Sequence, residues 1–188
     1  MKINRLLFVF FVTFLAVLLA ACSSGEKEDA HSAMNHSGTE EMEHMEHSSS
    51  GELPEGLKKA ETPTFETGSK AILQTDHMKG MNGAEATIAG VFDTTVYAIS
   101  YTPTTGGERV ENHKWIVQEE IKDASGEPYQ EGAKVEVEAD HMEGMKGSEA
   151  TIDSAEQTTV YMINYTSTDG EQVKNHKWVT ESELSATD

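Results

Sequence analysis

The chain has 188 residues, of which 33 are acidic and 14 basic, giving a formal net charge of −19. Phosphate repels such a surface, so the composition argues against nucleic-acid binding and against attraction to anionic lipid headgroups. The only cysteine is Cys22, which excludes an internal disulfide and any structural site built from several thiolates.

Residues 1–21 are typical of a secretory signal, with a charged start at Lys2 and Arg5 and an apolar run over residues 6–19. The sequence Leu19-Ala20-Ala21-Cys22 resembles a bacterial lipobox, which implies cleavage before Cys22 and attachment of a diacylglycerol there. An uncleaved transmembrane anchor is the alternative, but the apolar run is short for a span of about 20 residues. We therefore expect a lipid anchor at Cys22 on the extracytoplasmic face of the cell membrane.

Residues 22–60 combine that lipidated cysteine with a tract rich in Ser, Gly, Glu, His and Met, which predicts a disordered tether. Thioether and imidazole together form a soft ligand set that favours copper, chiefly Cu(I), with silver or zinc as other possibilities. A polar linker without a metal role is the alternative. The predicted tether ligands are His31, Met34, His36, Met42, His44, Met45 and His47.

The remaining chain is a tandem duplication, with one copy over residues 61–123 and the second over 124–188. The segment from Asp76 to Ile88 recurs from Asp140 to Ile152, at an offset of 64 residues. Asn-His-Lys-Trp at residues 112–115 recurs at 175–178, at an offset of 63. These matches predict two copies of one structural unit.

Each copy reads as four or five short strands, which predicts an all-β fold of two tandem SH3-like barrels. In chain order we expect strands at residues 70–75, 85–89, around 97–101 and at 110–117, with equivalents in the second copy. Tyr97, Ile99 and Tyr101 alternate onto one face of the third strand. Trp115 and Trp178 are predicted core residues of the fourth.

Each repeat also carries the motif His-Met-x-Gly-Met, whose glycine permits a tight turn. Such a turn could direct one histidine and two methionines toward an ion, with the histidine of Asn-His-Lys-Trp completing the set. Asp76 and Asp140 are candidates to orient the neighbouring histidines. The alternative is structural, with methionines capping the core. The candidate ligands are His77, Met78, Met81 and His113 in the first copy, and His141, Met142, Met145 and His176 in the second.

The lipobox, the His/Met-rich tether and two copies of His-Met-x-Gly-Met with a later Asn-His-Lys-Trp resemble the YdhK family. These are tandem-repeat surface lipoproteins of Gram-positive bacteria, and the staphylococcal copper-binding lipoprotein CopL belongs to the group. The resemblance implies copper binding outside the membrane and protection of the cell from excess copper.

The sequence contains no catalytic constellation, so we predict no enzyme activity. The function expected is copper sequestration by a membrane-anchored lipoprotein. Delivery of the metal to a copper exporter or another envelope protein is a variant of that function. The competing hypothesis is a cell-envelope interaction module that binds a wall polymer or protein, with no metal role for the repeats.

Overall fold

The computed structural model describes residues 48–187. The signal peptide, Cys22 and the seven tether ligands predicted from the sequence lie outside this part of the chain. Within residues 48–187, no helix has the length and apolar character needed to cross a membrane.

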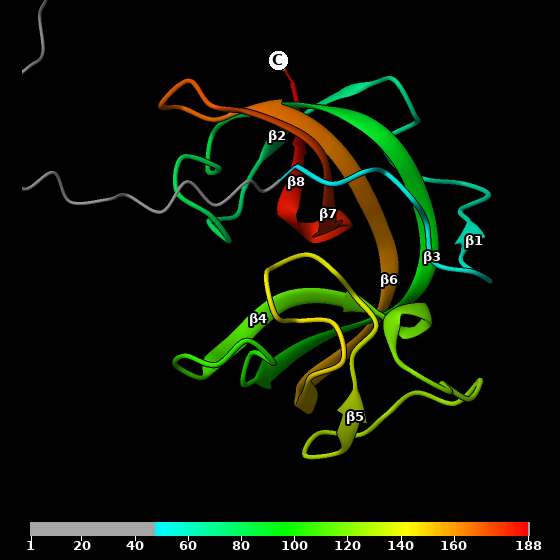
Figure 1. Cartoon of the computed structure of the whole chain (residues 1–188). Coiled ribbons are helices and arrows are strands. Elements are labelled where there is room, and N and C mark those ends of the chain that lie inside the picture. Colours follow the sequence, from blue (N-terminus) through cyan, green and yellow to red (C-terminus); the bar gives the residue numbers. More distant parts are fainter. Residues whose placement is uncertain (1–47, 188) are drawn as a thin grey trace, which may run out of the picture. The chain divides into compact units, whose positions relative to one another are not determined.

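The described residues form one eight-stranded sheet with two short 3-10 turns (Figure 1). Every strand pair is antiparallel. The first repeat supplies β1 (Lys58–Lys59), β2 (Lys70–Leu73), β3 (Glu85–Tyr101), β4 (Val110–Val117) and the turn η1 (Gln118–Glu120). The second supplies β5 (Lys134–Glu136), β6 (Glu149–Thr166), β7 (Gln172–Thr180), η2 (Glu181–Glu183) and β8 (Leu184–Ala186).

The two long strands β3 and β6 run side by side through the whole sheet, with Ala86 opposite Tyr165 at one end and Tyr101 opposite Ala150 at the other. Because they are antiparallel, the first half of β3 lies beside the second half of β6. One lobe contains these halves with β2, β7 and β8, and the other contains the remaining halves with β4 and β5 (Figure 1). Each lobe is therefore built from both repeats.

The hydrophobic cores also combine residues from both repeats. One core joins Leu73 and Met81 of the first repeat to Ile163 and Val179 of the second. The other joins residues around Tyr97 and Ile116 to residues around Val137 and Met145. A third cluster, on the middle of the long strands, contains both tryptophans.

The predicted all-β class and the tandem repeat are confirmed. Trp115 and Trp178 are buried, as expected, with exposed fractions of 7% and 0%. The structure differs from the expectation of separate second and third strands, since residues 85–101 form one strand. The polar residues between them stay in the sheet because each long strand pairs with the other repeat along its length.

A single sequence repeat therefore does not fold into a separate lobe. The second and last strands of the described chain also join the repeats, because β2 pairs with β8 as well as with β3. Exchange of strands between two copies of one motif places equivalent loops of both repeats on either side of the space between the lobes.

Candidate functional site

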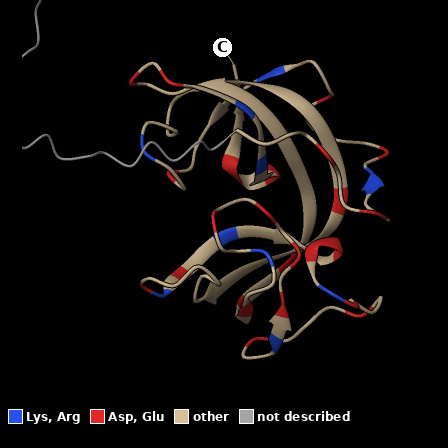
Figure 2. Cartoon of the chain, in the orientation of Figure 1, with Lys and Arg blue, Asp and Glu red and all other residues tan. Residues whose placement is uncertain are grey.

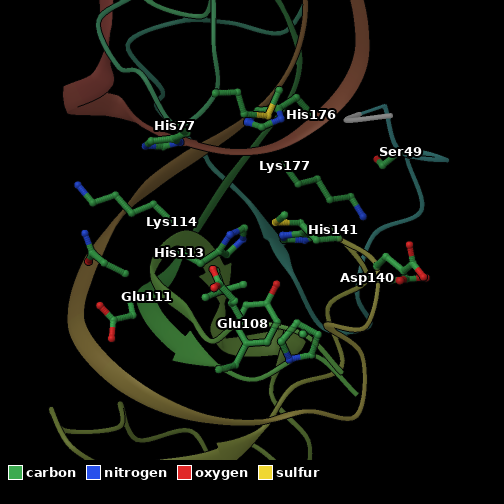
Figure 3. Close-up of a pocket in the computed structure, with 18 of the residues that line it drawn as sticks. Ser49, His77, Glu108, Glu111, His113, Lys114, Asp140, His141, His176 and Lys177 are labelled. Carbon is green, nitrogen blue, oxygen red and sulfur yellow. The ribbon is translucent and has the colours of Figure 1, made fainter. Parts of the chain in front are cut away.

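All four histidines of the repeats line one cleft of about 1570 Å³, together with Met78 and Met142. Figure 3 shows His77, His113, His141 and His176 around the same space. Residues separated by almost one hundred positions in the chain are therefore brought together, and the cleft draws equally on both repeats.

Irregular pairing in β4 and β7 directs two of these histidines. Each strand has register shifts on both sides of the histidine, where His113 lies opposite Ile99 and His176 lies opposite Ile163. The preceding residues, Asn112 and Asn175, have φ values of 51° and 52°. Asparagine tolerates this left-handed region better than most residues, which explains why it precedes the histidine in both copies.

The other two histidines are held by glutamates that come from the opposite repeat, Glu120 being buried and Glu183 half-buried. His77 Nε2 lies 2.6 Å from Glu183 Oε1, and His141 Nε2 lies 2.9 Å from Glu120 Oε1. Both imidazoles are 8% exposed, so water competes little for these bonds. Each pair therefore fixes a ring orientation and also joins the two repeats.

Each glutamate accepts further hydrogen bonds at its second oxygen. Trp115 Nε1 donates to Glu183 Oε2 at 2.9 Å, and Trp178 Nε1 donates to Glu120 Oε2 at 3.0 Å. The 3-10 turns also bring the backbone N–H groups of Thr180 and Val117, respectively, to the same oxygens. The tryptophans thus have a polar role besides filling the core.

These donors keep both carboxylates ionised. Burial opposes ionisation of Glu183, but His77, the Thr180 N–H and Trp115 outweigh it and lower the pKa to about 2. Burial opposes ionisation of Glu120 too, while His141, Trp178 and the Val117 N–H lower its pKa below the usual range. A carboxylate can only accept, so Nε2 of each paired histidine carries the proton.

Protonation at Nε2 leaves Nδ1 of a neutral ring with a free lone pair. Nδ1 of His77 and of His141 is buried and makes no hydrogen bond to any residue in the described range 48–187. The same holds for Nε2 of His113. Buried polar atoms are rarely left without partners, so these three nitrogens are suitable donors for a ligand that the protein binds.

His113 stays uncharged to unusually low pH. Burial, and then the nearby His141 and His77, lower its pKa to about 4 despite an opposing effect from Glu120. Its ring centroid lies 6.3 Å from that of His141 and 6.1 Å from that of Tyr101. A neutral imidazole is the form that binds metals, so His113 remains able to bind a metal in mildly acidic solution.

The structure regroups the candidate ligands. The sequence placed His113 with the His77 loop of its own repeat, whereas the exchanged strands place it beside His141 of the other. Met142 packs against the core of one lobe, and Met78 packs against the core of the other. Any ligand set in one lobe therefore combines residues of both copies.

Some of the predicted residues lie elsewhere. Met81 and Met145 are fully buried in the two cores, so they fill space in the protein interior instead of lining the cleft. Asp76 and Asp140 are exposed, and the glutamates orient the histidines in their place. Within residues 48–187, no three His, Cys, Asp or Glu side chains lie close enough together to hold a metal ion.

Glu120 and Glu183 were missed by sequence reasoning. A signal was present, because each follows the tryptophan of its repeat by five positions and the two are 63 residues apart. Their partner is distant in sequence, so the spacing alone could not show what they bind.

Charged residues surround the cleft. Three lysines and five acidic residues line it, namely Lys79, Lys114 and Lys177 and Asp76, Glu108, Glu111, Asp140 and Glu143. Figure 2 shows the positions of Asp and Glu, in red, spread along the chain of both lobes, with fewer positions of Lys and Arg, in blue. The surroundings therefore attract cations more than anions.

A family model described as "Protein of unknown function (DUF1541)" matches residues 67–118 and 131–181. The chain belongs to the DUF1541 family. The predicted relation to the YdhK group is confirmed, because the Bacillus subtilis (strain 168) "Uncharacterized protein YdhK" is 54% identical over 189 residues. That alignment covers 99% of this chain and 91% of YdhK.

Solved structures of the family show the same fold. A crystal structure of the DUF1541 family protein ydhK from Bacillus subtilis has a TM-score of 0.75 at 61% identity, covering 77% of this chain and 99% of that one. A solution NMR structure of the ydhK C-terminal domain has a TM-score of 0.63 at 64% identity, covering 65% and 94% respectively. The family name itself assigns no activity.

Proposed function

We propose that this protein is a membrane-anchored lipoprotein that binds copper, chiefly Cu(I), outside the bilayer and sequesters it. The observation that carries the proposal is the gathering of four histidines and two methionines, from both repeats, around one cleft. Imidazole and thioether are the ligand types that select soft metal ions. The His/Met tract at residues 31–47 and the lipobox at Cys22 support the same function from the sequence.

In this proposal the cleft binds the metal through histidine ring nitrogens and methionine thioethers. His141 Nδ1, His113 Nε2 and the Met142 thioether form the donor set of one lobe. His77 Nδ1, Met78 and His176 form the corresponding set of the other. Met78 and Met142 are half-buried, and rotation of these side chains would close each set around an ion.

Glu120 and Glu183 would act as positioning residues. A carboxylate that accepts the Nε2 proton fixes the tautomer and makes the other ring nitrogen a better donor. Ionised carboxylates also offset the charge of a bound cation, and the acidic surface raises the local concentration of cations. These effects favour capture of metal before it reaches the membrane.

A growth assay tests the function in the cell. A strain lacking the protein is complemented with the wild type, with a tether variant in which the seven ligands are replaced, or with a cleft variant carrying Met78→Leu and Met142→Leu. We expect reduced growth in excess copper for both variants and the lowest for their combination. Met162→Leu, in the core between the lobes, is the matched control and should protect fully.

Full protection by the combined variant would contradict the proposal. That result would favour the envelope interaction module instead, in which the cleft binds a wall polymer or protein. If the protein delivers copper to an exporter, the wild-type protein should protect cells that contain the exporter and should fail to protect cells that lack it.

A further inference from the structure

The two halves of the cleft are held together by different contacts, although the repeats supply equivalent residues to both. The first, called here the His77 half, contains His77, Met78 and His176 (Figure 3). The second, called the His141 half, contains His141, Met142 and His113. Three contacts stabilise the His77 half, and among residues 48–187 none of the three has a counterpart in the His141 half.

The first contact is made by residues 48–52, which bind the irregular part of β7 that carries His176. Ser49 Oγ donates to Asn175 O at 2.7 Å, and Asn175 Nδ2 donates to Ser49 O at 3.2 Å. The equivalent positions of β4 receive no such segment from the described chain, and Asn112 is exposed where Asn175 is half-buried. The strand that carries the histidine is therefore held more firmly in the His77 half.

The second contact joins the loop over residues 77–83 to the opposite repeat by an ion pair. Lys79 Nζ lies 3.4 Å from Asp169 Oδ2. In the His141 half the same positions are occupied by Glu143 and Thr105, which cannot form an ion pair. The pair is exposed, so its contribution is modest, but it adds to the other two contacts.

The third contact gives Glu183 one more hydrogen bond than Glu120 receives. Thr75 Oγ1 donates at 3.1 Å to Glu183 Oε1, the oxygen that also accepts from His77. The residue equivalent to Thr75 is Ala139, which has no side-chain donor, so this bond is missing from the His141 half. The carboxylate that orients the histidine is therefore less firmly fixed there.

The remaining contacts of the two loops with the opposite repeat are similar. Thr168 N donates to Gly80 O at 2.8 Å in the His77 half, and Thr104 N donates to Gly144 O at 2.9 Å in the His141 half. The His141 half adds an exposed bond from Thr104 Oγ1 to the same carbonyl, at 3.2 Å. One exposed hydrogen bond does not balance the three contacts of the His77 half.

We propose that the His141 half opens more readily and is the place where a metal ion enters and leaves the cleft, while the His77 half retains its ion. Local opening is easiest where few contacts hold a segment in place. The more accessible imidazole also lies in the His141 half, since His113 is half-buried whereas His176 is 7% exposed. One molecule could then both store an ion and release another to an acceptor.

The identity of the ion, a soft cation such as Cu(I), rests on the proposed function, but the difference in opening does not. Amide hydrogen exchange on the full mature lipoprotein in detergent micelles, without metal, measures that difference. Each loop has protected amides to report it, because Gly83 N donates to Leu73 O at 2.9 Å and Gly147 N donates to Val137 O at 2.7 Å. We expect residues 141–148 to be protected about fivefold less than residues 77–84.

Two substitutions remove contacts of the His77 half without touching a proposed metal ligand. Asp169→Asn with Thr75→Ala should lower the protection of residues 77–84 to about that of residues 141–148, which should not change. Lys70→Gln is the matched control, because it removes an exposed ion pair of the same lobe, to Glu85, outside the cleft. It should leave both loops as they are in the wild type.

A second measurement follows exchange soon after mixing with less than one equivalent of Ag(I), which serves as a redox-stable substitute for Cu(I). We expect Ag(I) to protect residues 141–148 before residues 77–84. Equal protection of the two loops without metal would overturn the inference, and so would earlier protection of residues 77–84 by Ag(I). If the loops differ without metal but Ag(I) changes neither, the proposed function fails and the role in metal entry fails with it.

Discussion

Glu120 accepts hydrogen bonds from three donors and Glu183 from four, so replacing either with its amide should destabilise the fold. In Glu120→Gln, a single amide oxygen replaces the two carboxylate oxygens that accept hydrogen bonds from Trp178, the Val117 N–H and His141. The new NH₂ group then faces a ring N–H. We expect a loss of about 1–3 kcal/mol in the free energy of unfolding. Affinity for Cu(I) should fall about 10–100-fold, the usual effect of losing such a partner.

Urea unfolding followed by tryptophan fluorescence measures the first effect, and chelator competition measures the second. Glu119→Gln is the matched control, because an amide oxygen can still accept the hydrogen bond from Thr94 Oγ1. The ¹⁵N shifts of His141 should report a change of tautomer in Glu120→Gln. An unchanged tautomer would show that Glu120 does not position the ring.

Gly80 and Gly144 meet the opposite repeat at close range. Their φ values are 75° and 73°, and an added Cβ would lie 2.7 Å from Asp169 Oδ1 and 2.6 Å from Thr105 Oγ1, respectively. Gly80→Ala and Gly144→Ala should each destabilise the protein by about 1–3 kcal/mol, through backbone strain and this overlap.

Gly83→Ala and Gly147→Ala separate the two causes in a thermal-unfolding series. These glycines also have positive φ, but a Cβ on either would meet open space. The stability lost on substituting either of these glycines should therefore be smaller than for Gly80→Ala or Gly144→Ala. Equal losses would mean that the close approach between repeats is unimportant for stability.

His113 should make the fold sensitive to acid. Its pKa is about 4 in the folded protein and near 6.5 when unfolded. Between these values the unfolded chain binds a proton that the folded chain does not, so stability is full above pH 6.5 and falls as the pH decreases toward 4. Urea unfolding at several pH values should give a flatter profile for His113→Gln than for the wild type. An equally steep profile would mean that another group carries the dependence.

At the scale of elements, the paired long strands make each lobe depend on both repeats. An isolated first repeat, residues 61–123, would leave half of two cores exposed. We expect it to be unfolded at low micromolar concentration and to fold only as a dimer that reproduces the β3–β6 pairing. Circular dichroism and sedimentation across a concentration series measure this. A stably folded monomer would contradict the exchanged arrangement.

The sequence predicted local elements well and long-range pairing poorly. Alternation of Tyr97, Ile99 and Tyr101 indicated the correct buried face, and glycine positions indicated the loops. Periodicity carries no information about which copy a strand pairs with when both copies have the same pattern. For the same reason, the four histidines and Met78 and Met142 were identified as a candidate site, but their grouping across repeats was not.

The methionines show most clearly what could not be predicted from the sequence. Met78 and Met81 differ by three positions within one motif, yet Met78 lines the cleft and Met81 is fully buried in a core. From composition alone, both methionines are candidate soft ligands for a metal, and only their different burial in the structure distinguishes them. Lipidation at Cys22 and metal binding by residues 31–47 remain predictions from the sequence.

For the molecule as a whole, a strand exchange between two repeats produces one cleft lined by histidines and methionines from both, next to the β7 edge on which residues 48–52 lie. An acidic surface surrounds that cleft, and the proposed lipid anchor keeps it at the membrane. The proposed capture of a soft cation outside the bilayer would depend on these features taken together.

The most direct test is a Cu(I) titration against a competing chelator. It compares residues 23–188, residues 48–188, and the shorter chain carrying either Met78→Leu with Met142→Leu or Met81→Leu with Met145→Leu. We predict that residues 48–188 compete for Cu(I), that the first pair weakens binding at least tenfold, and that the second pair does not. A copper site in the cleft would be contradicted if residues 48–188 failed to compete with the chelator for Cu(I). It would also be contradicted if the two double variants bound Cu(I) with equal affinity.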